Sequence, residues 1–160
     1  FHLIKFLLTF KNININKINE KSGILLYINL LSPLHCAVIG GNNELVKFLL
    51  KNFDAEIDVN IEGDNFYILI LSYDETPLQL AATYGNAVAV EILIGHNGIN
   101  INQKNIYFNN YIFSNLRCNL IIFFNQIPLH YACYGGHSNV IEVLVKQPNL
   151  KINKNNSSRA

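Results

Sequence analysis

The sequence predicts an all-α solenoid of stacked helix-turn-helix pairs, because one outline occurs three times along the chain. Each occurrence opens on a Pro-Leu step, breaks at a glycine, continues in a second apolar run and closes on an asparagine. The three units cover residues 32–60, 76–102 and 127–153. Neither helix of such a unit can bury its apolar face alone, so consecutive units must stack to build a core.

The first unit shows how each helix is specified. Ser32 is placed to cap a helix that begins at Pro33, where the missing N–H of proline costs nothing. Apolar residues follow at helical spacing, and Gly40-Gly41 ends this short helix because glycine adopts positive φ cheaply. A second apolar stripe then predicts a second helix, and it consists of Leu45, Val46, Phe48, Leu49 and Leu50.

The second and third units follow the same plan. Thr76-Pro77-Leu78 opens the second unit, small residues follow, and Gly85-Asn86 forms its break. Ile127-Pro128-Leu129 opens the third, and Gly136-His137 forms its break. The second stripes that we expect to be helical are Ala89, Val90, Ile92, Leu93 and Ile94 in one unit and Val140, Ile141, Val143, Leu144 and Val145 in the other.

The openings Ser-Pro-Leu-His at 32–35, Thr-Pro-Leu-Gln at 76–79 and Ile-Pro-Leu-His at 127–130, with the glycine break and closing asparagine, resemble the ankyrin repeat. The resemblance implies an ankyrin-type solenoid whose pairs are joined by hairpin loops. Two departures matter. Gln79 replaces the usual histidine, and Ile127 replaces the usual threonine, whose lost cap should cost about 1 kcal/mol.

Residues 1–16 resemble the second half of a unit. Lys5-Phe6-Leu7-Leu8 matches Lys47-Phe48-Leu49-Leu50, and Asn16 matches the closing Asn60. We therefore expect a partial unit over residues 1–16 rather than a targeting segment. The sequence contains no methionine, so we expect a fragment of a longer chain. Residues 154–160 are polar and aperiodic, and we expect a frayed tail there.

Apolar inserts separate the units, whose starts lie farther apart than the about 33-residue period of the family. The inserts cover about residues 24–31, 66–73 and 106–124, where an ankyrin stack has finger-like hairpins. Their β-branched and aromatic runs are typical of strands. Three interpretations stay open: hairpins that pair side by side and cover a binding groove, an exposed surface for a partner, or translated noncoding sequence absent from the mature protein. Sequencing the mature transcript across the inserts would test the third.

Composition excludes several functional classes. The net charge is +1 with 14% charged residues, so no basic field attracts nucleic acid. Polar residues interrupt every apolar run before it reaches the length of a membrane span. The cysteines, Cys36, Cys118 and Cys133, have no metal-ligand spacing and fit free thiols in a reducing compartment. We therefore expect an intracellular, cytoplasmic protein, with the nucleus left open.

No residue pattern indicates catalysis. His35 and His130 occupy the same slot of the turn, where the resemblance assigns a structural hydrogen bond. The glycine pairs lack the lysine and hydroxyl residue of a phosphate loop. No Ser/His/Asp set has a nucleophile context. We expect no enzyme activity, no cofactor, no metal and no small-molecule substrate.

By resemblance, the expected function is a protein–protein interaction scaffold that binds a partner of unknown identity through its concave face. The alternative is a regulatory or anchoring segment of a larger enzyme or channel. Candidate contacts on the first helices are the outward-facing Cys36, Ile39, Leu80, Thr83, Tyr84, Tyr131 and Tyr134, with tyrosines prominent because aromatic anchors dominate interfaces. Candidate contacts in the fingers are the polar residues Glu62, Asp64, Asn65, Gln103 and Lys104.

Overall fold

The computed structural model describes residues 15–16, 29–67, 71–105 and 126–152 of the 160-residue chain. Several predictions from the sequence fall outside these residues. They concern nearly all of the partial unit 1–16, most of the first insert, the third insert 106–124, Cys118, Asn153 and the tail 154–160. Those predictions stay untested.

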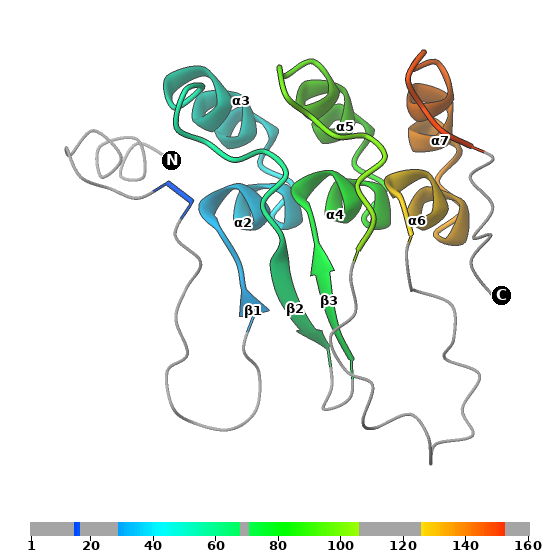
Figure 1. The fold of residues 1–160 in the computed structure, drawn as a ribbon, viewed down its shortest axis with the longest axis horizontal. Helices are drawn as coiled ribbons and strands as arrows, with labels where there is room; N and C mark the ends of the chain where they lie inside the picture. The colour runs from blue at the N-terminus through cyan, green and yellow to red at the C-terminus, as the bar shows by residue number, and fades with distance from the viewer. Residues whose placement is uncertain (1–14, 17–28, 68–70, 106–125, 153–160) are drawn as a thin grey trace, which may run out of the picture.

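Within the described residues, three helix pairs stand side by side in two rows (Figure 1). The inner row consists of α2 (Pro33–Ile39), α4 (Pro77–Thr83) and α6 (Pro128–Tyr134). The outer row consists of α3 (Asn43–Asn52), α5 (Ala87–Ile94) and α7 (Ser138–Val145). Each helix packs against its own pair mate and against its neighbours in the same row. The predicted helical solenoid is confirmed.

Local sequence signals account for the helix ends. Proline opens each inner helix, and Thr76 accepts a hydrogen bond from the backbone N–H of Gln79 at 3.3 Å. The outer helices α3 and α5 begin at asparagine caps, since Asn42 and Asn86 accept bonds from backbone N–H groups three residues on. Between the helices of the second pair, Gly85 has φ of 68°, a conformation that side chains disfavour.

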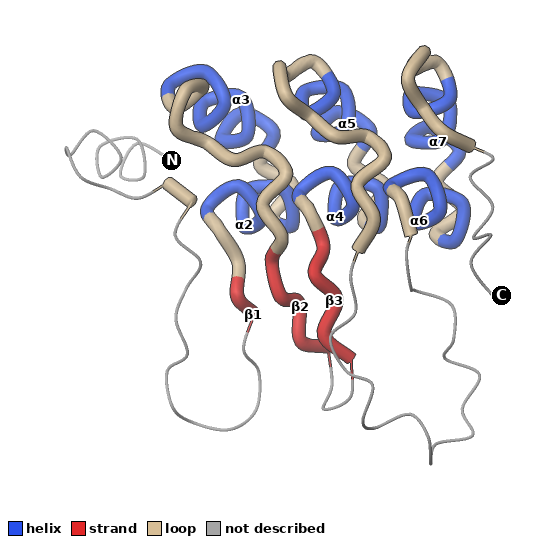
Figure 2. Tube along the Cα trace, in the orientation of Figure 1, coloured by secondary structure: helices blue, strands red, loops and turns tan. Residues whose placement is uncertain are grey.

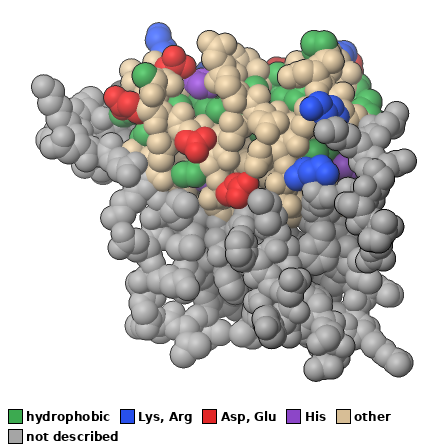
Figure 3. Space-filling view, viewed as in Figure 1, with side chains coloured by type: hydrophobic (Ala, Val, Ile, Leu, Met, Phe, Trp, Pro, Cys, Tyr) green, Lys and Arg blue, Asp and Glu red, His purple; other side chains and the backbone are tan. Residues whose placement is uncertain are grey.

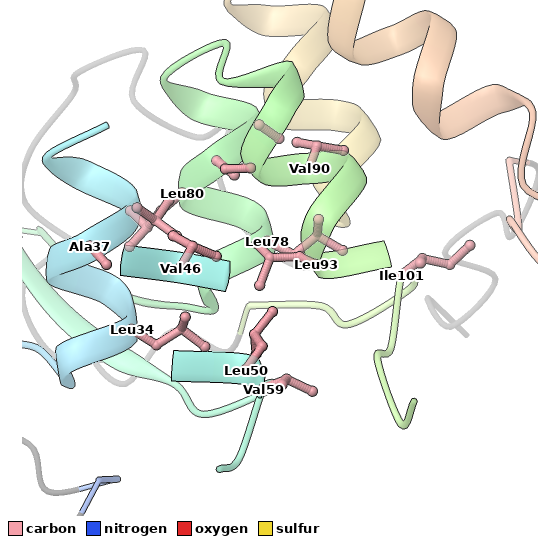
Figure 4. Close-up of a cluster of buried hydrophobic side chains, with 14 of the residues drawn as sticks. Leu34, Ala37, Val46, Leu50, Val59, Leu78, Leu80, Val90, Leu93 and Ile101 are labelled. Atoms are coloured by element: carbon pink, nitrogen blue, oxygen red, sulfur yellow. The ribbon is translucent and has the colours of Figure 1, made fainter. Parts of the chain in front are cut away.

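The core runs along the stack between the two rows. Leu34 and Leu78 are the first leucines of their inner helices and are 1% exposed, and Val46, Val90 and Leu93 of the outer row are fully buried. Figure 4 shows these side chains converging from successive units into one continuous cluster. Because each unit contributes only part of this core, the units stabilise one another.

Finger-like segments project from the inner row and carry a three-stranded antiparallel sheet (Figure 2). The strands are β1 (Asn29–Leu30), β2 (Gly63–Tyr67) and β3 (Leu71–Glu75), in the order β1-β2-β3. The predicted second insert, residues 66–73, coincides with the end of the β2–β3 hairpin. In the described residues, β2 and β3 pair with each other and β2 also pairs with the two-residue strand β1. Whether the inserts form paired hairpins that cover a binding groove stays a prediction.

Closing asparagines latch each unit to the next. In three places one asparagine side chain makes two hydrogen bonds to the main chain of the following unit, between residues about 40 to 50 apart in sequence. Asn16 makes the same pair of contacts as Asn60 and Asn102, so it occupies the same slot. The bonds run from Asn16 to Glu56 O (2.6 Å) and Asp58 N (2.8 Å), from Asn60 to Gly98 O (2.8 Å) and Asn100 N (2.7 Å), and from Asn102 to Asn149 O (2.9 Å) and Lys151 N (2.8 Å).

Candidate functional site

The ends of the inner helices carry a row of side chains that repeats once per unit. Ile39, Thr83 and Tyr134 are the last residues of α2, α4 and α6. Ile39 and Thr83 are half-buried, whereas Tyr134 is 64% exposed. Tyr84 directly follows Thr83 and is 47% exposed. We call these four residues the inner-helix row, and its two tyrosines have the character of interface anchors.

Polar residues of two successive fingers meet at the finger bases. The amide Nε2 of Gln103 donates to Oε1 of Glu62 at 2.8 Å, and Nδ2 of Asn100 donates to Oε1 of Gln103 at 2.7 Å. Lys104, the next residue, is half-buried. Its positive charge acts on His130 and contributes to lowering the pKa of that imidazole, after the larger effect of burial. Three predicted finger residues, Glu62, Gln103 and Lys104, therefore lie along one polar edge.

The two groups of predicted contacts lie at opposite ends of the inner helices. The fingers lead into the N-terminal ends, as β3 leads into α4, whereas the inner-helix row lies at the C-terminal ends (Figure 1). Seven residues at a rise of 1.5 Å separate the two groups by about 10 Å. A partner must therefore span the length of the inner helices to contact both.

Two predicted contact residues do not face outward, and that expectation is wrong for them. Leu80 is fully buried and Tyr131 is 5% exposed. Both occupy the same slot in successive inner helices, and these helices pack directly against their row neighbours. Figure 4 shows Leu80 beside Ala37 of the preceding unit. The slot therefore belongs to the interface between units.

The remaining predicted contacts have mixed placements. Cys36 occupies the slot of Leu80 one unit earlier and is exposed. Desolvation of the Cys36 thiol raises its pKa, so the sulfur stays protonated at neutral pH and is a poor nucleophile. Asp64 and Asn65 contribute backbone to β2, where they pair with Asp74 and Tyr73 of β3. The structure does not describe their side chains.

His35 locks the first described finger onto the stack. Its Nδ1 accepts a hydrogen bond from the backbone N–H of Ser32 at 3.1 Å, so the proton of the neutral ring sits on Nε2. Nε2 then donates to the carbonyl of Glu75 at 3.0 Å, at the end of β3. Burial lowers the pKa of His35 from 6.5 to about 4. The predicted structural role of His35 is confirmed.

Gln79 performs the same task in the second unit with an amide in place of an imidazole. Its Oε1 accepts from the backbone N–H of Thr76 at 2.7 Å, as Nδ1 of the histidine does. Its Nε2 donates to the carbonyls of Gln103 and Gln126, at 3.0 and 2.9 Å, on the two sides of the next finger. The replacement of histidine by glutamine therefore preserves the lock, because the amide supplies one acceptor and two donors.

The third unit keeps half of this arrangement. Nδ1 of His130 accepts from the backbone N–H of Ile127 at 3.1 Å. Ile127 has no hydroxyl to cap the helix, but it is only 4% exposed and belongs to the core. Burial of an aliphatic side chain thus offsets the missing cap at this position.

Two further histidines, His96 and His137, make contacts between units that the sequence did not predict. His137 is the residue directly before α7, and its Nε2 lies 2.9 Å from the carbonyl oxygen of Thr83 in the unit before. Its ring fills the space beside Gly85, where an added Cβ would lie 2.6 Å from Nδ1. His96 lies 2.8 Å from Asp54 of the first unit. Gly85, which leaves room for the imidazole of His137, is the sequence feature that could have indicated the contact between His137 and Thr83.

Charge is unevenly distributed along the stack. Asp54, Glu56 and Asp58 are exposed in the loop after α3, whereas Lys146 and Lys151 are exposed in the third unit. Figure 3 shows acidic side chains mostly toward the first unit and lysines gathered toward the third on this face. Within the described ranges, no three His, Cys, Asp or Glu residues are grouped as a metal site. In the same ranges, no helix combines the length and apolarity needed to cross a membrane.

Comparison with known families agrees with this architecture. The family model described as ankyrin repeats, in three copies, matches residues 1–105, and a single ankyrin repeat matches residues 124–157. The chain belongs to the ankyrin-repeat family. Ankyrin repeats are typical of protein–protein interaction and are generally not catalytic. The chain is also 29% identical over 118 residues to the human transient receptor potential cation channel subfamily A member 1; the alignment covers 74% of this chain and 8% of that protein.

Proposed function

We propose that this chain is a non-catalytic scaffold that binds another protein through the inner-helix row and the polar finger edge. The observation that carries the proposal is the pair of tyrosines, Tyr84 and Tyr134, which remain 47% and 64% exposed at the ends of adjacent inner helices. Large aromatic side chains at such positions are enriched among the residues that contribute most to binding. An intracellular location is part of this proposal.

The geometry favours an extended partner over a small ligand. The inner-helix row and the edge formed by Glu62, Gln103 and Lys104 lie about 10 Å apart along the helices. The finger edge carries both a carboxylate and an ammonium group, with Gln103 already bonded to Glu62. A partner with an apolar segment for the tyrosines and mixed polar groups for the edge would complement this surface.

Site-specific photocrosslinking can test the proposal. A photoreactive residue at position 84 should capture a protein from cells that express the chain, whereas the same residue at Lys51, exposed on the outer helix α3, should not capture it. The captured protein is then produced, and its affinity is measured by calorimetry. The double variant Tyr84→Ala/Tyr134→Ala should weaken binding by about 100-fold, as expected for two aromatic contacts.

A matched variant controls for nonspecific effects. Val88 of α5 is 48% exposed but belongs to the outer row. Val88→Ala should leave the affinity within about twofold, since it lies outside the proposed surface. Unchanged affinity in the tyrosine double variant, with helical content intact, would reject the inner-helix row as the binding site.

A second candidate function is a regulatory or anchoring segment of a larger enzyme or channel. It is supported by the similarity to a segment of the human cation channel subunit. The full-length transcript discriminates the two proposals. A reading frame that continues into membrane-spanning or catalytic sequence favours the second, whereas a reading frame that contains only ankyrin units favours the scaffold.

A further inference from the structure

The loop after α5 contains Asn97-Gly98, the only Asn-Gly step in the sequence. Asparagine is chemically labile, and asparagine followed by glycine is the pair most prone to deamidation. The reason is that the backbone nitrogen of the following residue attacks the side-chain amide, and glycine has no side chain to obstruct it. This step is therefore a candidate site of covalent modification.

The structure leaves the reacting atoms of this step accessible. Asn97 and Gly98 are both exposed. Within the described ranges, neither the side-chain amide of Asn97 nor the backbone N–H of Gly98 has a hydrogen-bond partner. Gly98 has φ of 83°, and a Cβ added there would meet no atom within 4 Å. The nitrogen can therefore approach the amide carbon without opening the fold.

The latch asparagines, Asn60 and Asn102, differ in each of these respects. The side chain of each makes two hydrogen bonds to the next unit. The residues that follow them, Ile61 and Gln103, carry side chains, and each donates its backbone N–H to the carbonyl three residues before it, at 3.3 and 3.0 Å. The structure thus holds both latch asparagines away from the reaction that it leaves open at Asn97.

We propose that Asn97-Gly98 is a self-modification site whose product loosens the interface between the first and second units. The backbone nitrogen of Gly98 attacks Cγ of Asn97, and the amide nitrogen leaves as ammonia with the proton of the Gly98 N–H. Water then opens the resulting succinimide. Opening at the side-chain carbonyl gives aspartate, and opening at the main-chain carbonyl gives isoaspartate, whose backbone runs through Cβ and Cγ. This inference does not depend on the inner-helix row.

The loop is fixed to the first unit on both sides of the reacting step. Before the step, Nε2 of His96 lies 2.8 Å from Oδ1 of Asp54. After the step, the carbonyl of Gly98 accepts from Nδ2 of Asn60 at 2.8 Å, and the N–H of Asn100 donates to Oδ1 of Asn60 at 2.7 Å. Isoaspartate lengthens the backbone between these anchors. Because hydrogen bonds weaken steeply with displacement, the Asn60 latch cannot keep its geometry.

Ageing the complete folded chain in mildly alkaline buffer, followed by peptide mapping, tests the reaction. Asn97 should convert to aspartate and isoaspartate no more than about tenfold more slowly than in the urea-unfolded chain, because no local opening is required. The internal controls Asn60 and Asn102 should convert at least about tenfold more slowly than Asn97 in the folded chain. Asn97→Gln should abolish the conversion, since its longer side chain closes a ring that forms more slowly. Stronger protection of Asn97 by folding would overturn the proposal.

Hydrogen exchange tests the consequence for the interface. In the isoaspartate fraction, identified by peptide mapping, the Asn100 amide should exchange at least about tenfold faster than in the fresh chain. The Lys151 amide, held by the Asn102 latch, should exchange at an unchanged rate. Fresh Asn97→Asp carries the charge without the longer backbone and should leave Asn100 exchange within about twofold. Unchanged Asn100 exchange in the isoaspartate fraction, or equal acceleration at Lys151, would refute the proposed loosening.

Discussion

Replacing Gln79 with alanine tests whether each finger is locked to its helix pair. The Gln79 side chain is fully buried and makes three side-chain hydrogen bonds, to Thr76 N, Gln103 O and Gln126 O, at 2.7 to 3.0 Å. Alanine leaves these backbone groups without their partner. A net bond contributes about 0.5–1.5 kcal/mol, and an unsatisfied buried group costs about 1–3 kcal/mol. We expect the free energy of unfolding to fall by about 3 kcal/mol.

The matched substitution is Gln79→His, which installs the residue that His35 provides in the first unit. Its ring keeps one acceptor and one donor, so only one of the two finger carbonyls loses its bond. We expect a loss of about 1 kcal/mol. Urea unfolding followed by circular dichroism, with equal slopes for all variants, gives both values. A loss under 1 kcal/mol in the alanine variant, or equal losses in both variants, would refute the lock.

Three further predictions concern individual contacts. In the folded state His35 has a pKa of about 4 and is neutral. In the unfolded chain the same imidazole takes up a proton below about pH 6.5. The free energy of unfolding should therefore fall by about 2 kcal/mol from pH 7 to pH 5. His35→Gln should remove this part of the slope in urea titrations, and an unchanged slope would contradict the assignment. Asn60→Ala removes the two side-chain hydrogen bonds to Gly98 and Asn100. It should lower the free energy of unfolding by about 1–2 kcal/mol and speed hydrogen exchange at the Asn100 amide. Asn60→Asp should have an intermediate effect, because it keeps the acceptor for the Asn100 N–H. Ile127→Thr gains a cap but loses core burial, so the free energy of unfolding should change by less than about 1 kcal/mol. A gain above about 2 kcal/mol would show that the cap dominates.

The helices could be predicted from the sequence because their signals are local. Proline at the first position, a hydroxyl or amide cap and a glycine within ten residues specify where a short helix begins and ends. The structure begins α2, α4 and α6 directly after residues 32, 76 and 127, where the sequence predicted the units to open. The structural role of His35 was implied by the resemblance of this turn to the ankyrin repeat.

The fingers could be predicted only as segments with strand character. Alternating or continuous apolar runs indicate extended backbone but do not specify which strands pair. The structure supplies that pairing for β1, β2 and β3, with Asn65 opposite both Asn29 and Tyr73. Whether the inserts are retained in the mature protein is a property of the transcript and stays a prediction.

The sequence by itself determined the repeat, its three helix pairs and the slot of each turn residue, since these depend on contacts within a few residues. The tertiary structure decided which repeated slots face solvent. Leu80 and Tyr84 both looked available from the sequence, yet Leu80 is fully buried and Tyr84 is 47% exposed. Burial in a solenoid depends on the neighbouring unit, about 40 to 50 residues away, and so do the asparagine latches and the contact of His137 with Thr83. Such distances leave no local pattern, which is why only the assembled stack separates core from surface.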